Sequence, residues 1–250
     1  MNQNEMSVYD HIGELRKRLV IVFIFFVVAF VGSLFVVEHF ILFLQRADEA
    51  KELTMNAFRL TDPIKIYMEF AFIIAFIVTF PIILFQLWAF ISPGLYKKER
   101  KVTLSYIPMS LFLFLAGLSF SYFILFPFVV EFMTQLSDRL AIEQVIGINE
   151  YFEFLFQLTL PFGLLFQLPV VIMFLTRLGI VTPAYLSKSR KYAYFVLLVI
   201  AAFITPPEII SHLMVSIPLF ILYEISILIS RGAYRKKMKA EVAEIDEVEK

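Results

Sequence analysis

The sequence contains no cysteine, which excludes disulfides, thiolate metal sites and cysteine nucleophiles. Charged residues are also scarce, at 18% of the chain, against about 25% in an average soluble domain. The three histidines, His11, His39 and His212, do not have the spacing of metal ligands. The sequence motifs of zinc proteases, serine hydrolases, P-loops and dinucleotide-binding folds are missing. We therefore expect a protein that is not an enzyme and that binds no cofactor.

Hydrophobic residues, in contrast, make up 60% of the 250 residues, and 30 residues are Phe. Soluble domains contain about 45–50% apolar residues, and a soluble fold of this length could not bury such an excess. The formal net charge of zero gives no indication of nucleic-acid binding. The composition therefore predicts an all-α integral membrane protein.

Six apolar segments carry this excess, and they occupy residues 19–37, 66–91, 103–130, 154–175, 192–204 and 209–229. Each of the first four has the roughly 20 residues that a membrane-spanning helix needs. The fifth has 13 residues, so it is either a buried hairpin arm or a short helix in a locally thinned bilayer. Its polar connection to the sixth segment favours two separate crossings.

Basic residues are distributed unevenly between the connections. Of the 22 Lys and Arg residues, 17 lie before the first segment, in the second and fourth connections, and after the sixth segment. Six crossings with both termini in the cytoplasm place these 17 on the cytoplasmic side. We predict one six-helix membrane domain over residues 1–232, which includes a cytoplasmic amphipathic helix at 7–18. A mobile charged cytoplasmic tail is predicted over 233–250.

Glu14 lies in the predicted amphipathic helix, four residues before Arg18. One interpretation is a local ion pair on the surface of an interfacial helix. The other is that Glu14 belongs to a cation-binding surface at the cytoplasmic face. The spacing of the residues favours the local ion pair and leaves the second interpretation open.

Glu99 is the only acidic residue in the strongly basic connection between the second and third segments. In one interpretation this connection is a solvated determinant of topology, with Glu99 near the positive end of the next helix. In the other, Glu99 accepts an incoming guanidinium with the help of Phe90 and Tyr96. Arginine can form two hydrogen bonds to a carboxylate and can stack on aromatic rings.

Further polar residues lie inside apolar segments, where such groups usually face the protein interior or water. They are Glu69, Gln86, Gln157, Gln167, His212 and Glu224. Gln167 is deep in the fourth segment, two residues before Pro169, and either makes a structural hydrogen bond or has a functional role. For Glu224, in the sixth segment, the alternatives are a contact with Arg231, a contact with another helix, or a place near the cytoplasmic interface.

Several sequence runs resemble the TatC family, the core subunit of the twin-arginine protein translocase. The first is HIGELRKRL at residues 11–19. The others, in the same order as in the family, are at residues 80–90, 93–100, 126–127, 151–152, 162–169, 178–180, 205–208 and 222–224. The resemblance covers about residues 8–232 and is strongest to the TatCy type.

The resemblance implies a receptor for signal peptides with paired arginines, which takes part in the export of folded proteins driven by the proton-motive force. It implies a cupped arrangement of six helices, with short fifth and sixth helices, in the bacterial cytoplasmic membrane. The residues that match the family's signal-peptide site are Glu14, Glu99, Phe90, Leu95 and Arg16. The residues that match its intramembrane polar or partner contacts are Gln167, Glu208 and Glu224. For Glu14 and Glu99, the resemblance favours the cation-binding interpretation.

The resemblance also implies partners: a single-span TatA-type subunit, a TatB-type subunit where one is present, signal peptides of folded cargo, the lipid bilayer and further copies of the chain. Many members carry Glu at the position of Gln167, so a mechanism that needs an ionisable group there is not expected. The alternative function is a secondary transporter for a small solute. Such a protein would show two similar halves with broken helices, and the two halves of this sequence differ.

Overall fold

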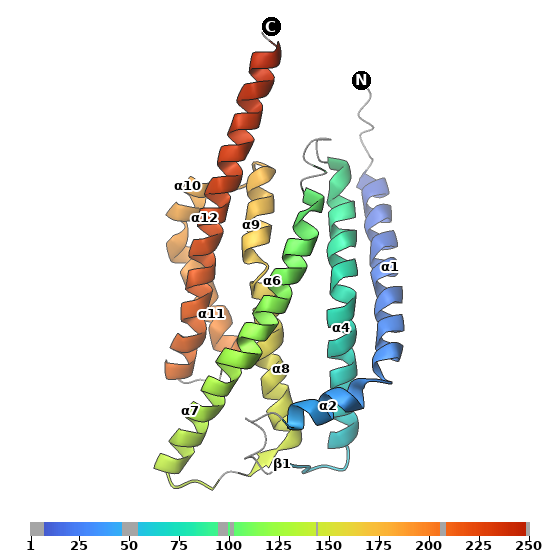
Figure 1. Ribbon diagram of the computed structural model, residues 1–250, viewed down its shortest axis with the longest axis vertical. Helices are drawn as coiled ribbons and strands as arrows, with labels where there is room; N and C mark the ends of the chain where they lie inside the picture. The colour runs from blue at the N-terminus through green and yellow to red at the C-terminus, as the bar shows by residue number, and fades with distance from the viewer. Residues whose placement is uncertain are drawn as a thin grey trace. The chain divides into compact units, whose positions relative to one another are not determined.

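The computed structural model describes residues 8–46, 55–94, 100, 103–143, 145–205 and 209–248. In these ranges the chain is almost entirely helical, and a short parallel pair of strands joins β1 (Met55–Asn56) to β2 (Ile146–Gly147). The helical elements in chain order are α1 (Val8–Ser33), α2 (Val37–Gln45), α4 (Asp62–Ile91), the 3-10 turn η1 (Ser92–Gly94), α6 (Tyr106–Phe120), the π-helical turn η2 (Ser121–Leu125), α7 (Phe126–Arg139), α8 (Ile148–Leu165), α9 (Leu168–Arg177), α10 (Pro183–Lys188), α11 (Arg190–Ile204) and α12 (Ile209–Val248) (Figure 1).

Four of the described helical segments are long and apolar enough to cross a membrane, at residues 62–91, 106–139, 148–177 and 210–238. A fifth candidate consists of α1 and α2 together, with a bend of 63° between them. α11 has 15 residues, which agrees with the short fifth helix that we predicted. The all-α membrane fold is therefore confirmed, whereas the number of six crossings stays a prediction.

Two boundaries differ from those we predicted. α1 runs without a break from Val8 to Ser33, so the predicted amphipathic helix and the predicted first span form one helix. α12 has 40 residues and is longer than the short sixth helix that we predicted. It continues as helix through residues 233–248, and the mobility that we predicted for this charged tail stays a prediction. These residues contain no Gly or Pro and are rich in Ala, Glu, Lys and Arg, which favour helix.

Prolines explain two irregular places in the long helices. Pro127 has no amide N–H and its ring crowds the carbonyl group four residues earlier, and the chain forms the π-helical turn η2 just before it. Pro169 acts in the same way on the fourth predicted span, where α8 ends at Leu165 and α9 begins at Leu168. Both irregularities lie inside apolar segments and leave backbone groups for other partners to satisfy.

The chain divides into two compact units, and the boundaries between them fall inside α6 and α8. Unit 1 comprises residues 1–111 and 143–153, and unit 2 comprises residues 112–142 and 154–250. In unit 1, α1 and α2 pack against α4. In unit 2, α12 packs against α9, α10 and α11.

α1 and α4 run in opposite directions along each other in unit 1 (Figure 1). Near the end of α1, the Ser33 hydroxyl lies 2.8 Å from the carbonyl oxygen of Ala71, in the first half of α4. The Phe26 ring meets the Phe72 ring edge to face, at 5.1 Å between centroids. The start of α1 therefore lies beside the end of α4.

Unit 2 is held together by close contacts between helices. Gly117 of α6 lies against α8 so closely that a Cβ atom there would come within 2.8 Å of the Phe162 carbonyl oxygen. The buried hydroxyl groups of Thr176 on α9 and Ser230 on α12 form a hydrogen bond of 2.7 Å. Small and polar residues of this kind are typical where membrane helices approach closely.

Candidate functional site

Glu14 and Phe90, two residues of the predicted signal-peptide site, lie at the same end of unit 1. Arg18 of α1 donates a hydrogen bond of 3.3 Å from Nη1 to Oε1 of Gln86 on α4. Phe90 follows Gln86 by one helical turn, on the same side of α4. Glu14 precedes Arg18 by one turn on α1. The antiparallel packing thus brings together two positions that are 76 residues apart in the sequence.

The Glu14 carboxylate is paired with Arg18, as its spacing predicted. Arg18 donates from Nε to Oε1 of Glu14 at 3.1 Å, and a second short bond joins Nη2 to the same oxygen. The two side chains retain 23% and 22% of their exposure, so the pair is partly accessible. Arg18 therefore already occupies the carboxylate to which we predicted that an arginine of the signal peptide would bind.

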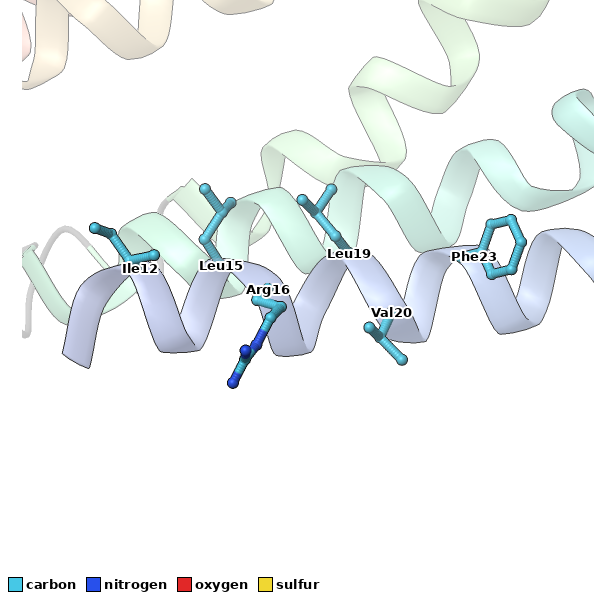
Figure 2. A pocket seen from close by; sticks show the side chains of 6 residues that line it. All are labelled: Ile12, Leu15, Arg16, Leu19, Val20 and Phe23. Atoms are coloured by element: carbon cyan, nitrogen blue, oxygen red, sulfur yellow. The ribbon is translucent and has the colours of Figure 1, made fainter. Parts of the chain in front are cut away.

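Arg16 lies apart from this pair. Residues two positions apart in an α-helix are separated by about 200° around its axis, so Arg16 and Glu14 lie on nearly opposite sides of α1. Arg16 is one of the residues that line an open groove, and the others are Ile12, Leu15, Leu19, Val20 and Phe23 (Figure 2). Figure 2 shows all six side chains on this one helix, with Arg16 extending away from it. The structure thus separates Arg16 from Glu14, although the sequence analysis placed both in one site.

Trp88 organises the end of α4. Its indole N–H donates to the Thr103 hydroxyl at 3.1 Å, and the Arg100 guanidinium lies 6.0 Å from the centre of its rings. The Thr103 hydroxyl also bonds to the Arg100 carbonyl oxygen at 3.2 Å. These contacts hold Arg100 and Thr103, which lie toward the C-terminal end of the basic connection, against Trp88 of α4. Leu95 and Glu99, which complete the predicted site, lie outside the described residues.

Gln167 lies at the break between α8 and α9 and forms the N-terminal cap position of α9. Its backbone N–H donates to the Leu164 carbonyl oxygen, and its own carbonyl accepts from Val171, at 3.0 and 2.9 Å. The side chain is partly buried. The predicted polar position thus coincides with an interruption of the apolar span. Glu208, the second predicted polar contact, lies outside the described residues.

Glu224 is paired with another helix, which was one of the alternatives that the sequence left open. The Arg190 guanidinium at the start of α11 donates from Nε to Oε1 and from Nη2 to Oε2, at 2.7 and 2.8 Å. The Tyr194 hydroxyl donates to Oε1 at 2.6 Å. This two-point geometry is the strong form of an arginine–carboxylate pair. Glu224 therefore joins α12 to α11 within the chain.

The sequence analysis missed Gln86, Arg190 and Tyr194 as partners of the predicted residues. Arg190 had been counted only among the basic residues that determine topology, and Gln86 was one of several polar residues in apolar segments. The spacing of a helix identifies pairs one turn apart, whereas these contacts join different helices. Among the described residues, no group of three His, Asp or Glu side chains is arranged to hold a metal ion.

Comparisons with known proteins agree with these observations. The family model "Sec-independent protein translocase protein (TatC)" matches residues 10–218. The chain is 67% identical to the Sec-independent protein translocase protein TatCy of Bacillus subtilis (strain 168), with 98% of this chain and 97% of that protein covered. It is 41% identical to TatCd of the same strain, with coverage of 97% and 99%.

Solved structures show the same similarity. A crystal structure of the twin-arginine translocase receptor TatC superposes with a TM-score of 0.80 at 31% sequence identity. The match covers 89% of this chain and 99% of that chain. A crystal structure of the receptor in DDM gives a TM-score of 0.81 at the same identity, with coverage of 88% and 99%.

Proposed function

This chain belongs to the TatC family of Sec-independent protein translocase proteins, and we propose that it is the receptor that binds the paired arginines of twin-arginine signal peptides. As a member of this family it is a translocase component of the cytoplasmic membrane, which it crosses several times, and it is not an enzyme. The observation that carries the proposal is the similarity to the TatC receptor over nearly the whole chain, at a TM-score of 0.80.

The position of Glu14 supports a receptor site at one end of unit 1. Arg18 and Gln86 connect its helix to the end of α4, where Phe90 supplies an aromatic side chain. A carboxylate beside an aromatic ring suits a guanidinium, which forms directed hydrogen bonds and stacks on ring faces. In the proposal, Glu14 and Glu99 accept one arginine each, and Phe90 and Leu95 contact the apolar part of the signal peptide.

Arg16 has a different part in the proposal. It carries the same charge as the signal arginines and lies on the side of α1 away from Glu14. It therefore contacts another group of the bound peptide or a partner subunit. The apolar groove around it offers a surface for such a contact.

Glu99 is proposed as the principal acceptor, because it is the only acid among the bases of its connection. Neighbouring cations keep its carboxylate ionised, and they repel cations that cannot form two hydrogen bonds with it. Replacing Glu99 with Ala should weaken the binding of a paired-arginine peptide by about 2–5 kcal/mol if the pair is partly desolvated. Glu99→Gln should lose most of the same affinity, since the amide keeps the size without the charge.

The test is a binding titration with paired-arginine and paired-lysine peptides, combined with photocrosslinking from positions 14, 90 and 99. Glu131→Gln serves as the matched control, because it removes an exposed acid that hydrogen-bonds to Gln135 within α7. Wild-type affinity of the Glu99→Gln variant for the paired-arginine peptide would show that charge at this position is not the recognition element.

Six crossings with both termini in the cytoplasm are part of the proposal. α11 is long enough for about 22 Å, so as a crossing it needs a locally thin bilayer. Single cysteines introduced into this cysteine-free chain provide the measurement. Cysteine at position 208 should react with an impermeant reagent from outside, and cysteine at 188 only after the membrane is opened. Cytoplasmic labelling at 208 would contradict six crossings.

We also propose that Gln167 and Glu208 form polar contacts with partner subunits, including the single-span TatA type, and that copies of the chain associate. Gln167 lies at a break in the span, where freed backbone groups and a polar side chain suit a contact inside the membrane. For Glu224, the pair with Arg190 supports a contact within the chain, which a partner can reach only by competing with Arg190.

A further inference from the structure

We propose that Arg18 is the resident occupant of the Glu14 carboxylate, and that an arginine of the signal peptide binds there by exchange with it. Gln86 then retains the released guanidinium beside α4. This inference rests on the proposed function, because it describes how the Glu14 part of that receptor site is opened. It adds a residue and a step that the two proposed carboxylates alone do not contain.

The hydrogen bonds of Arg18 carry the inference. Two of its nitrogens share Oε1 of Glu14, and its third, Nη1, points to Gln86 at 3.3 Å. The guanidinium therefore already has a second acceptor when the first one is withdrawn. Both members of the ion pair are partly exposed, so a guanidinium from outside can reach the carboxylate without any rearrangement of the helices.

Charge explains why exchange is favoured over addition. Lys17 and Arg18 follow Glu14 by three and four residues, so two cations lie on the same side of α1 as this single carboxylate. A further guanidinium that bound without displacing Arg18 would add a third cation at close range and be repelled. Exchange keeps one guanidinium on the carboxylate, because Arg18 moves toward Gln86 as the incoming arginine takes its place.

Exchange also limits what one arginine can gain. The incoming arginine replaces hydrogen bonds of the same kind that Arg18 had made, so the net gain at Glu14 is small. Most of the affinity must then come from the second arginine and from the apolar segment of the peptide. A peptide with one arginine and no further contact therefore binds weakly, because Arg18 competes with it for the Glu14 carboxylate.

α1 does not depend on Arg18 for its attachment to α4. The Ser33 hydroxyl lies near the Ala71 carbonyl, the Tyr67 hydroxyl bonds to the Leu34 carbonyl oxygen, and aromatic rings pack between the helices. These contacts lie further along α1 and remain when Arg18 is changed. Substitution of Arg18 is therefore expected to leave the helix pair intact.

The experiment measures peptide affinity of the full-length chain in nanodiscs of zwitterionic lipid. Arg18→Gln should bind a synthetic paired-arginine peptide about two- to fivefold more tightly, the factor that corresponds to an ion pair of this exposure. A paired-lysine peptide should gain by the same factor, because the cost of displacing Arg18 does not depend on the incoming cation. Lys17→Gln is the matched control, since it removes a neighbouring positive charge of an exposed side chain. It should change either affinity by less than Arg18→Gln does.

The double variant Glu14→Gln/Arg18→Gln separates this inference from the proposed function. If exchange operates, Arg18→Gln gives no gain once Glu14 is an amide. Unchanged or weaker binding by Arg18→Gln, or an equal gain from Lys17→Gln, would overturn the exchange. If the double variant instead binds as tightly as Arg18→Gln alone, the carboxylate contributes nothing even without a competing arginine, and Glu14 is removed from the receptor site.

Discussion

Two arginine–glutamate pairs in this protein have the same chemistry and different architecture. Glu14 and Arg18 lie one turn apart on α1 in unit 1, and two of the three guanidinium nitrogens of Arg18 share one carboxylate oxygen. Glu224 and Arg190 lie 34 residues apart, on α12 and α11 in unit 2, and use both carboxylate oxygens. The first pair costs little to open, because both residues stay on the same helix. The second joins two helices and has to break for them to separate.

This difference suggests a division of roles. A local pair on a partly exposed helix surface contributes little to stability and can be exchanged. A two-point pair between helices, reinforced by the Tyr194 hydroxyl at 2.6 Å, holds the helices in register. Substitutions at Glu14 should therefore affect binding, and substitutions at Glu224 should affect stability.

The largest effect on stability is expected at Glu224. Glu224→Gln should lower the free energy of unfolding by about 1–2 kcal/mol, since charged hydrogen bonds exceed neutral ones but partial exposure weakens this pair. Thermal unfolding of the purified protein in detergent checks this. Arg190→Gln and the neighbouring Lys191→Gln form the matched comparison, and only Arg190→Gln should destabilise. Equal melting temperatures for these two variants would contradict the role of the pair.

A smaller effect is expected where unit 2 is joined by neutral groups. Thr176→Val keeps the shape of the side chain and removes the hydroxyl group that shares the buried hydrogen bond with Ser230, which should cost about 1 kcal/mol. Ser226→Ala is the control, because the Ser226 hydroxyl bonds only within its own helix, to the Leu222 carbonyl at 2.7 Å. The double variant Thr176→Val/Ser230→Ala should lose less stability than the sum of the single changes. A strictly additive result would argue against the contact.

The smallest effect on stability is expected at Glu14. Glu14→Gln should lower the stability of the protein by only about 0.3–0.5 kcal/mol, the usual size of a pair one turn apart on a helix. Binding of a paired-arginine peptide should fall slightly at the same time, because the peptide loses only its small net gain at Glu14. Unfolding and peptide titration of the same preparation check both results. A loss of stability as large as that of Glu224→Gln would remove the distinction between the two pairs.

Much of the fold could be predicted from the apolar segments. The apolar segment at residues 66–91 predicted a membrane-spanning helix, and the structure has this helix as α4, which begins four residues earlier, at Asp62. The 13-residue segment at 192–204 predicted the short helix α11. The continuation of α12 to Val248 was not predicted, because the charged tail was treated as a region beyond the last helix, and the mobility of that tail stays a prediction. Strong helix formers continue a helix whatever their charge.

The candidate site was harder to predict from the sequence than the fold was. Glu14–Arg18 followed from helical spacing, and the structure contains that pair. Which helix carries the partner of Glu224 was left open, because residues 34 positions apart meet only when two helices pack. The same holds for Arg18 and Gln86, whose contact depends on the antiparallel packing of α1 and α4.

The sequence by itself determined that this protein lies in a membrane as a set of helices. Apolar length and the need to satisfy every backbone group inside lipid leave no other choice for such a chain. It did not determine the break at Gln167, because Pro169 lies next to a break whereas Pro81, Pro161 and Pro218 lie inside continuous helices. Only the tertiary structure decided that the pair of Glu14 and Arg18 lies beside Gln86, and that Glu224 holds Arg190. These contacts arise from the packing of one helix on another, which the local pattern of residues does not specify.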